Sequence, residues 1–399
     1  MKRRQFISAT GGALLASAGM LSCAAKPKPP ASIKLFLGGD VMTGRGIDQA
    51  FPISSHPRLY EQRTDDARYF LERAEASSGA FTRPVSHAYP WGDAMEIWSQ
   101  MRPDARIINL ETSITRHDGH WPGKAIHFRM HPDNVQCLSA GGIDLCALAN
   151  NHALDWGRHG LRETQETLAA AGIRFAGAGS DLRQASKPAV LPLGGGPRLK
   201  VYSMATFDSG IEEKMAARPG SPGVWSIPRL SPDITAPLLE RIRSEKQAGD
   251  IVVASIHWGG NWGYHIPADQ RRFARALIAA GVDVIHGHSA HHRKGIEIID
   301  GRAVLYGCGD LINDYEGIKG DMGRFRNELV LMYFLTLDAH SGALQELRMR
   351  PMRIRRFRLN HASIQDAEWL TRIMHTEGQR LNTAVWLEAD GWMALDWAA

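Results

Sequence analysis

The sequence predicts an α/β fold, in which strands and helices alternate along one large domain or two smaller ones. Short apolar, β-rich runs recur along the chain, and stretches with helical periodicity separate them. The chain has 399 residues, of which 44% are hydrophobic, and this is ample for such a fold. Five of the apolar runs end at side chains that commonly bind metal ions. Because open α/β sheets place their sites at strand ends, we expect a site at one sheet edge.

Periodicity and glycine positions predict the individual elements. Helices are expected over residues 94–101, 158–171, 268–280 and 366–379 and within 228–247. Strands are expected at the five apolar runs, the last of which is 282–285, and at 173–176 and 199–205, and hairpins are expected at 300–301 and 340–342. Residues 48–91 lack strong strand signals and are expected to form an insertion over the end of the first strand.

Residues 1–25 have the pattern of an export signal. Arg3 and Arg4 form a twin-arginine pair before an apolar run that is too short and too rich in alanine and glycine to span a membrane. Cys23 lies in a lipoprotein-like processing site, although cleavage near Ala25 would remove it. Residues 26–32 are a proline-rich linker. We expect a protein in the periplasm or on the outer face of the membrane, where a lipid anchor would be its only membrane contact.

The charge balance gives no reason to expect a nucleic-acid partner. The formal net charge is +5, but residues 1–30 carry five basic and no acidic residues, so 42 of each remain. Three cysteines follow the leader, an odd number that is not a disulfide framework. Cys137 and Cys146 could pair, but their apolar surroundings favour buried free thiols.

Metal-ligand side chains gather in five segments that end predicted strands. These are residues 38–40, 109–111, 150–152, 257–259 and 286–292. Asp, Glu, Asn and neutral His suit Mn, Zn, Fe or Mg and suit sulfur-seeking metals poorly. The last segment has four histidines in seven residues, which core packing does not readily explain. The pattern predicts a metal-dependent hydrolase or a close relative of one.

The first two segments supply carboxylates. Asp40 follows two glycines and is a candidate to ligate or bridge metals; the alternative is a helix N-cap or turn aspartate. Arg45 is a candidate to clamp a phosphate or carboxylate, with a surface arginine as the alternative. Glu111 follows a buried strand, so a metal or Arg45 is expected to meet its charge. Asn109 is expected to donate or accept a hydrogen bond within the site.

The third segment combines amide and imidazole side chains. Asn150 and Asn151 precede His152, which suits a general acid or a transition-state donor, and Asp155 is placed to orient its ring. The alternative is an Asx-turn that also caps the following helix. Both alternatives remain open from these residues alone.

Two further residues flank the predicted site. Trp258 follows His257 and is expected to form a rigid wall against the substrate. Asp310 ends another predicted strand and is a candidate to support a metal ligand.

Six motifs between residues 33 and 315 resemble the CapA family of poly-γ-glutamate capsule synthesis proteins, which is similar to the calcineurin-like metallophosphoesterases. They read GGDVMTGR, INLETSIT, ANNHALDWGRHGLRETQETLAAAGI followed by GAG, HWG, GVDVIHGHSAHHRKGIE and LYGCGD. The resemblance implies a four-layer αββα sandwich over residues 33–358 with a short helical extension over 359–399. It also implies one or two divalent ions, His152 as the catalytic histidine, and a metal shell of Asp40, Glu111, Asn151, His257, His288 and His291.

Arg45, Asn109, Asn150 and Trp258 are expected to contact the substrate of such a site. The chain departs from the family pattern at Met42, Asn261 and the pair Ser289-Ala290, and Glu111 stands for a bridging aspartate. The number of ions and the choice of ligands among His286, His288 and His291 therefore stay open.

Two functions are compatible with these features. The first is an exported metal-dependent hydrolase that acts on a phosphoester, or on an amide or ester bond of an anionic cell-surface polymer. The alternative is a non-catalytic factor that binds the polymer and assists capsule or envelope assembly together with the synthesis machinery. Fold alone does not choose between them.

Overall fold

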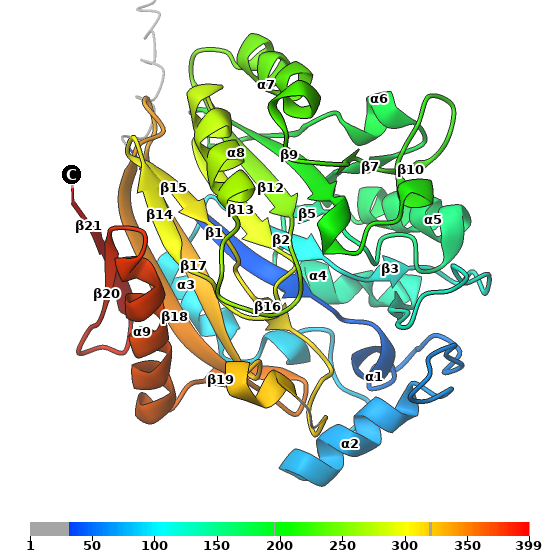
Figure 1. The fold of residues 1–399 in the computed structure, drawn as a ribbon. Helices are drawn as coiled ribbons and strands as arrows, with labels where there is room; N and C mark the ends of the chain where they lie inside the picture. The colour runs from blue at the N-terminus through cyan, green and yellow to red at the C-terminus, as the bar shows by residue number, and fades with distance from the viewer. Residues whose placement is uncertain (1–31, 195, 319–320, 399) are drawn as a thin grey trace, which may run out of the picture.

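Two large β-sheets share one apolar core in a computed structural model that describes residues 32–194, 196–318 and 321–398 (Figure 1). The predicted export signal, Cys23 and the linker up to residue 31 lie outside the described residues. Within those ranges, no helix has the length and apolar character needed to cross a membrane.

The first sheet has ten strands and combines parallel and antiparallel neighbours. Its order is β20-β21-β18-β17-β1-β2-β5-β6, with β16 beside β1 and β19 beside β18. The central strand β1 runs parallel to β2 and β16 and antiparallel to β17. The bounds are β1 Ser32–Val41, β2 Ala105–Leu110, β5 Leu145–Ala147, β6 Arg174–Ala176, β16 Asp310–Ile312, β17 Leu329–Asp338, β18 Leu344–Arg355, β19 Arg358–His361, β20 Thr383–Leu387 and β21 Met393–Trp397.

The second sheet has seven strands in the order β11-β9-β12-β13-β15-β14, with β8 beside β9. Its bounds are β8 Ala189–Pro192, β9 Arg198–Thr206, β11 Ser226–Ile227, β12 Asp250–His257, β13 Val284–His288, β14 Ile296–Ile299 and β15 Arg302–Leu305. Two small pairs lie apart from both sheets: β3 Ser113–Ile114 with β4 Arg129–Met130, and β7 Ala178–Gly179 with β10 Gly223–Val224.

The sheets face each other through side chains that alternate along their strands. Leu35 and Leu37 of β1 meet the cluster that includes Val253 of β12 and Val284 of β13. Phe36, between the two leucines, points to the other face and packs against Trp98. Alternation with period two therefore gives β1 two buried faces, which explains why its sequence is apolar almost throughout.

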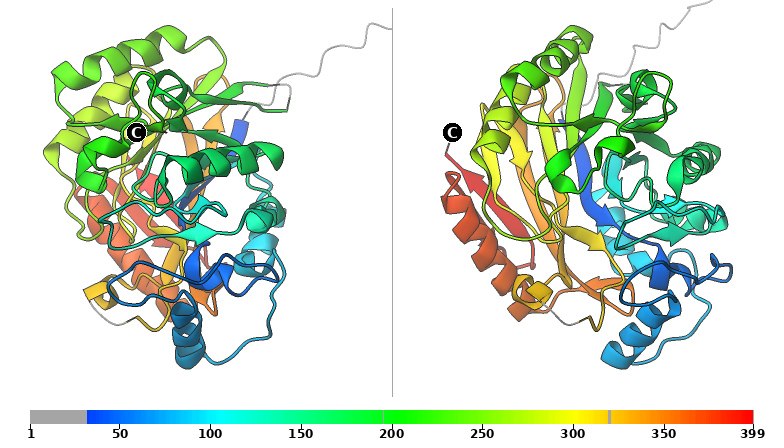
Figure 2. Two further views of the ribbon diagram at one scale, coloured as in Figure 1. Left: turned by 90° about the vertical axis from the view of Figure 1, so that its right-hand side faces the viewer. Right: turned by 45° about the vertical axis from the view of Figure 1, so that its right-hand side comes forward.

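Helices cover the outer faces of the two sheets (Figure 2). The first sheet packs against α1 Arg45–Asp48, α2 Arg68–Ser78, α3 Ala94–Met101, α4 Gln136–Ala140 and α5 Gly157–Ala170. The second packs against α6 Leu182–Ala185, α7 Pro232–Glu245 and α8 Ala268–Ala279. Short 3-10 helices occupy Tyr89–Trp91, Pro132–Val135, Phe207–Ser209, Glu213–Met215 and Asp321–Phe325.

The predicted alternation of strands and helices is confirmed, and so are both hairpins, β14–β15 and β17–β18. The expected helices correspond to α3, α5, α7, α8 and α9, with shifts of a few residues at their ends. The insertion over residues 48–91 contains α2, a helix that its weak pattern did not predict. Cys137, Cys146 and Cys308 are buried free thiols, as expected.

The C-terminal extension is helical only in part, which corrects the expectation of a short helical extension. Helix α9, Ile364–Gln379, is followed by β20 and β21, and this hairpin joins the first sheet through β18. Leu370 and Met374 of α9 enter the core between the two sheets. Helix α9 therefore closes one side of that core, next to β14, β18 and β20.

A pair of substitutions on α9 tests this closure. Leu370 is 0% exposed, so Leu370→Ala should lower the free energy of unfolding by about 2–5 kcal/mol through lost burial and a cavity. Ile364 on the same helix is 55% exposed, so Ile364→Ala should change it by less than about 0.5 kcal/mol. Urea unfolding of both variants measures the difference. Equal losses would show that α9 does not close the core.

Candidate metal centre

Three neighbouring strands bring two carboxylates and one amide together. Asp40 of β1 lies directly beside Asn109 of β2 and beside Asp310 of β16. Close approach of β1 and β16 requires glycine at position 39, because a Cβ atom there would lie 1.7 Å from the Gly309 carbonyl oxygen. The backbone N–H of Asp40 donates to that same oxygen at 2.9 Å. The glycines of the first motif therefore set the position of Asp40.

The second sheet contributes histidines at the corresponding strand ends. His257 of β12 and His288 of β13 are adjacent across the ladder, and their Nδ1 atoms lie 2.9 Å apart. Ligand atoms of Asp40, His257 and His288 all lie within 4.8 Å of one another. The same is true of Asp40, His291 and Asp310. Asp40 thus belongs to both groups of metal-ligand side chains.

Two buried oxygens in this region have no hydrogen-bond partner in the described structure. They are Oδ2 of Asp40 and Oδ1 of Asn151. Leaving a buried acceptor unsatisfied costs about 1–3 kcal/mol. A divalent cation among these groups would satisfy the Asp40 oxygen, and the oxygen and nitrogen donors here suit such an ion. The residues therefore fit the metal that the sequence predicts.

The pKa values of the buried carboxyl groups also favour a bound cation. Burial, together with the charge of Asp310, raises the pKa of Asp40 to about 7. Burial and the nearby charge of Asp40 also raise the pKa of Glu111 well above its ordinary value. A cation would relieve this repulsion and favour the ionised forms. Burial lowers the pKa of both His257 and His288, so their rings are neutral, the form that binds metals.

Asn109 and Asn150 support the carboxylates, which corrects the expectation that both contact substrate. Asn109 Nδ2 donates to Asp40 Oδ1 at 2.8 Å and to Glu111 Oε2 at 3.3 Å. Asn109 Oδ1 in turn accepts from Asn150 Nδ2 at 3.0 Å. Both amides are fully used and essentially inaccessible to solvent. They therefore act through Asp40 and Glu111, not through a substrate.

His152 forms a dyad with Asp155 beside this cluster. Its Nδ1 lies 2.7 Å from Asp155 Oδ2, and its Nε2 lies 3.7 Å from Glu111 Oε1. Lys124 pairs with the other oxygen of Asp155 and lies 3.3 Å from His152 Nδ1. Burial lowers the pKa of His152 to about 4 although Asp155 opposes this, so the ring is neutral near pH 7. Its Nε2 faces the carboxylates while Asp155 fixes its orientation.

Arg45 and Trp258 have other partners than the sequence predicted. The guanidinium of Arg45 pairs with Glu61 at 3.0 Å and, on its other side, with Asp314. Its donors are thus held by two protein carboxylates, so it is not an open clamp for an anion. Trp258 is 1% exposed, and its Nε1 donates to the Tyr306 carbonyl in the core under α7 and α8. It is a packing residue and does not line the site.

The histidine-rich segment divides between structural and ligand-type roles. His286 lies between the Ser255 hydroxyl and the Gly38 carbonyl, and His292 accepts from the Gly263 N–H. His288 and His291 are the members that join Asp40 in the two groups described above. The structure thus brings together Asp40, Glu111, His152, His257, His288 and His291. Asn151 precedes His152 in the chain, and its side chain lies beside Gly210.

Two of the open alternatives are resolved by the local backbone. Helix α1 begins after Gly44 without a side-chain cap, so Asp40 is not an N-cap. The Asx-turn is present, because Asn150 Oδ1 accepts from the His152 N–H at 3.0 Å. No side chain caps α5, so the second half of that alternative is wrong. The turn thus coexists with the dyad and holds His152 in place.

Two residues lie closer to the centre of the site than the sequence predicted. Asp310 was expected only to support a ligand, but its carboxylate stands among the ligand-type groups themselves. The signal was its Gly-Cys-Gly-Asp sequence, which repeats the glycine-rich ending of β1. Lys124 lies in a long segment without strand or helix, so no local pattern marked it.

The fold and the site together define a class: an α/β protein with a buried carboxylate–histidine centre of the kind that can hold divalent metal ions. Residues 34–315 match the family model described as "Bacterial capsule synthesis protein PGA_cap". The chain belongs to this family, which confirms the resemblance to CapA proteins.

Curated relatives agree with this assignment. A probable polyglutamine synthesis accessory protein of Mycobacterium tuberculosis (strain H37Rv) is 43% identical over 357 residues, which cover 89% of this chain and 94% of the relative. The PGA biosynthesis protein CapA of Bacillus subtilis (strain 168) is 31% identical over 207 residues, 52% of each chain. The capsule biosynthesis protein CapA of Bacillus anthracis is 24% identical over 277 residues, 69% of this chain and 58% of the relative.

Proton release should accompany metal binding. With a pKa of about 7, the Asp40 carboxyl is largely protonated below that pH, and a metal ion must displace the proton. Affinity for Mn²⁺ or Zn²⁺ should therefore rise about tenfold per pH unit up to about pH 7 and then level off with respect to this group. Isothermal titration calorimetry in buffers of different ionisation enthalpy measures both quantities. A pH-independent affinity without proton release would exclude Asp40 as a ligand.

Proposed function

We propose that the protein is an exported, metal-dependent hydrolase of capsule or cell-envelope polymer metabolism. Its substrate would be a phosphoester, or an amide or ester bond in an anionic polymer such as polyglutamate. The observation that carries this proposal is the position of Asp40, which belongs to two ligand groups, keeps one oxygen without a hydrogen bond and neighbours Glu111, the carboxylate that His152 Nε2 approaches at 3.7 Å. The names of the relatives, which refer to polyglutamine, PGA and capsule synthesis, support the polymer.

The residues divide into two ligand sets with Asp40 in common. His257, His288 and the Asn151 oxygen would complete one set, and His291 with Asp310 the other. Glu111 lies beside Asp40 and shares the Asn109 amide with it. A divalent ion of the Mn, Zn, Fe or Mg type would supply an activated water molecule and polarise the bond to be cleaved.

His152 is placed to move a proton at Nε2. Asp155 holds Nδ1, so Nε2 is the nitrogen that faces the reacting groups. Because the resting ring is neutral, it would first accept a proton and then return it to the leaving group. The role of general acid thus depends on a preceding step in which the same nitrogen acts as a base.

We propose further that the layers form a four-layer αββα sandwich of the metallophosphoesterase type. The two sheets share one core, and helices cover the outer face of each. Metal sites at the strand ends of two facing sheets suit this arrangement.

A polymer-binding assembly factor is the second candidate. The M. tuberculosis relative is named an accessory protein, and the His257–His288 contact shows that these rings can also satisfy each other without a metal. Such a factor would bind the polymer and the capsule machinery without turnover.

Export is tested by the twin-arginine pair. Changing Arg3 and Arg4 to lysine should retain the protein in the cytoplasm, because twin-arginine signals tolerate this change poorly. Cell fractionation measures the location, with Lys26 and Lys28 changed to arginine as the matched control. Palmitate labelling of the wild type and of Cys23→Ala tests the lipid anchor; labelling that survives the substitution would exclude Cys23.

Three variants separate metal binding from proton transfer. His257→Ala should lower metal content, because the ligands bind the ion jointly. His152→Ala should keep the metal and lower turnover roughly 10²–10⁴-fold, the usual contribution of a positioned acid or base. Asp155→Asn should lower turnover less than His152→Ala does, since the imidazole ring of His152 is still present.

For the wild type and each variant, elemental analysis measures the metal content, and separate assays measure hydrolysis of phosphodiesters and of polyglutamate. Ile364→Ala, the exposed substitution on α9, serves as a control for handling and folding. If His257→Ala and His152→Ala both retain full metal and full capsule-related function, the hydrolase is excluded and the assembly factor stands.

A further inference from the structure

The turn between β18 and β19 presents a group of arginines that the proposed hydrolytic site does not use. Arg355 ends β18 and Arg358 begins β19, with Arg356 and Phe357 between them in the left-handed region, at φ 56° each. Phe357 is 1% exposed and packs beside Gly46 and Phe81. This buried anchor fixes the turn, so the arginines leave it in defined directions.

Two of these arginines are oriented but not neutralised. Arg356 Nε donates to the Ser78 carbonyl, at the C-terminal end of α2, at 2.9 Å, and Arg355 approaches the same oxygen at 3.5 Å. Neither forms an ion pair with any carboxylate of the described residues, whereas Arg358 pairs with Asp93 at 2.7 Å. A guanidinium has five N–H donors, so each keeps most of them for a ligand.

A hollow of about 850 Å³ opens beside the turn and lacks acidic residues among its described lining. Arg355, Arg356 and Arg358 line it together with the hydroxyl groups of Thr82 and Ser86. Guanidinium groups bind carboxylates through paired hydrogen bonds, and hydroxyl donors add to such a contact. The hollow therefore has the chemistry of a carboxylate site.

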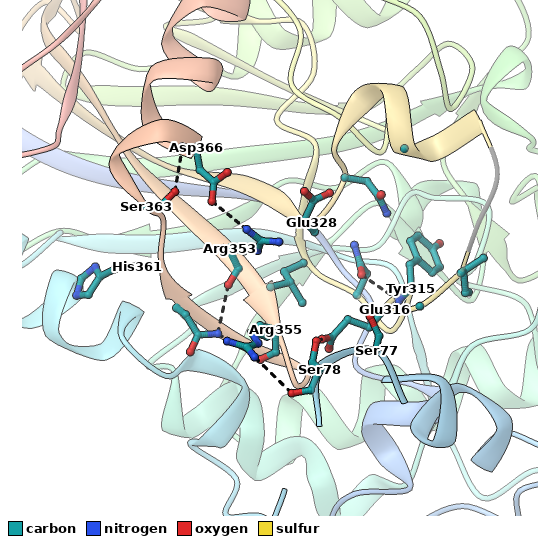
Figure 3. A pocket seen from close by; sticks show the side chains of 17 residues that line it. Ser77, Ser78, Tyr315, Glu316, Glu328, Arg353, Arg355, His361, Ser363 and Asp366 are labelled. Carbon is teal, nitrogen blue, oxygen red and sulfur yellow. Dashed lines mark hydrogen bonds and ion pairs between the residues drawn. The ribbon is translucent and has the colours of Figure 1, made fainter. Parts of the chain in front are cut away.

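This hollow continues toward the candidate metal centre. It shares Arg355 and Asn360 with a second hollow of about 800 Å³ (Figure 3). The second hollow shares Tyr315 and Ile318 with a third of about 330 Å³, which His291 lines. Three hollows that share lining residues thus lie in series between the arginine turn and a ligand-type histidine, an arrangement that suits an extended chain better than a compact ligand.

Charges along the path are distributed unevenly. In the second hollow, Arg353 pairs with Asp366, and Glu316 accepts from the Phe357 N–H and the Ser78 hydroxyl. Asp366 is therefore compensated, whereas Glu316 is held by neutral donors and keeps its charge. Among the described residues, the arginines of the hollows without an ion pair include Arg355 and Arg356 at the far end and Arg63 in the third hollow. An anionic chain would be held at the arginine turn while another part of it reaches the metal centre.

We propose that Arg355, Arg356 and Arg358 form a distal subsite that binds carboxylates of an extended polyglutamate chain whose other part lies at the metal centre. The choice of polyglutamate rests on the proposed function, whereas the subsite itself rests on the arginine turn and the adjoining hollows.

Binding of labelled glutamate chains to the full protein tests the subsite. Wild-type protein should bind long polyglutamate more tightly than triglutamate, because only a long chain reaches both ends of the path. The double variant Arg355→Gln/Arg356→Gln should bind the long chain roughly 2–30-fold more weakly, the combined effect expected of two partly exposed ion pairs. Triglutamate binding at the metal centre and metal content should not change.

Matched controls identify the cause of any loss. Arg355→Lys/Arg356→Lys should recover part of the affinity, and Arg183→Gln on α6, an exposed arginine outside the three hollows, should have no effect. Added salt should weaken the wild type more than the glutamine variant. Thermal unfolding confirms that each variant folds.

Other outcomes would overturn the proposal in different ways. Equal binding of the long chain by wild type and glutamine variant, or no binding by either, would exclude the subsite. An equal arginine-dependent gain with a single-stranded oligonucleotide would indicate a surface for nucleic acid. His257→Ala distinguishes the two proposals: loss of metal with intact arginine-dependent binding would leave the subsite in place even if no hydrolysis is ever found.

Discussion

The centre of this protein depends on carboxylates held together away from water. Asp40, Glu111 and Asp310 sit at strand ends that the pairing of β1 with β2 and β16 in the first sheet brings into one place. Their mutual repulsion is met only in part by Asn109, which donates to two of them. The apolar core thus supplies the free energy that assembles an arrangement whose local electrostatics favour a bound cation.

Local patterns were sufficient to locate the ligand-type residues. His257 and His288 end adjacent parallel strands of the second sheet, so strand prediction placed these two near each other. Asp40 ends a strand of the first sheet, and the packing of the two sheets, which no local pattern shows, brings it to the histidines. Glycines at positions 38, 39 and 287 strengthened that prediction, since they permit close backbone approach. The helices were predicted from apolar periodicity. Periodicity, like the strand pattern, depends only on residues that are close together in the sequence.

Interactions between distant segments were beyond such patterns. Arg45 had the appearance of an anion clamp, but its partner Asp314 is 269 residues away and leaves no trace in the surrounding sequence. Trp258 follows a ligand-type histidine, and alternation along the strand turned it to the opposite face. The strands after α9 were missed because their partner, β18, is rich in arginine and has the pattern of a sheet edge.

The topology of the first sheet also governs when the chain can fold during synthesis. Strand β1 emerges first, yet its neighbours β16 and β17 are made only after residue 310. Until then the apolar side chains of Leu35 and Leu37 lack much of the core that buries them. Such long sequence separations slow folding and expose strand edges to aggregation. The first sheet can therefore be completed around β1 only after residues 310–338 have left the ribosome.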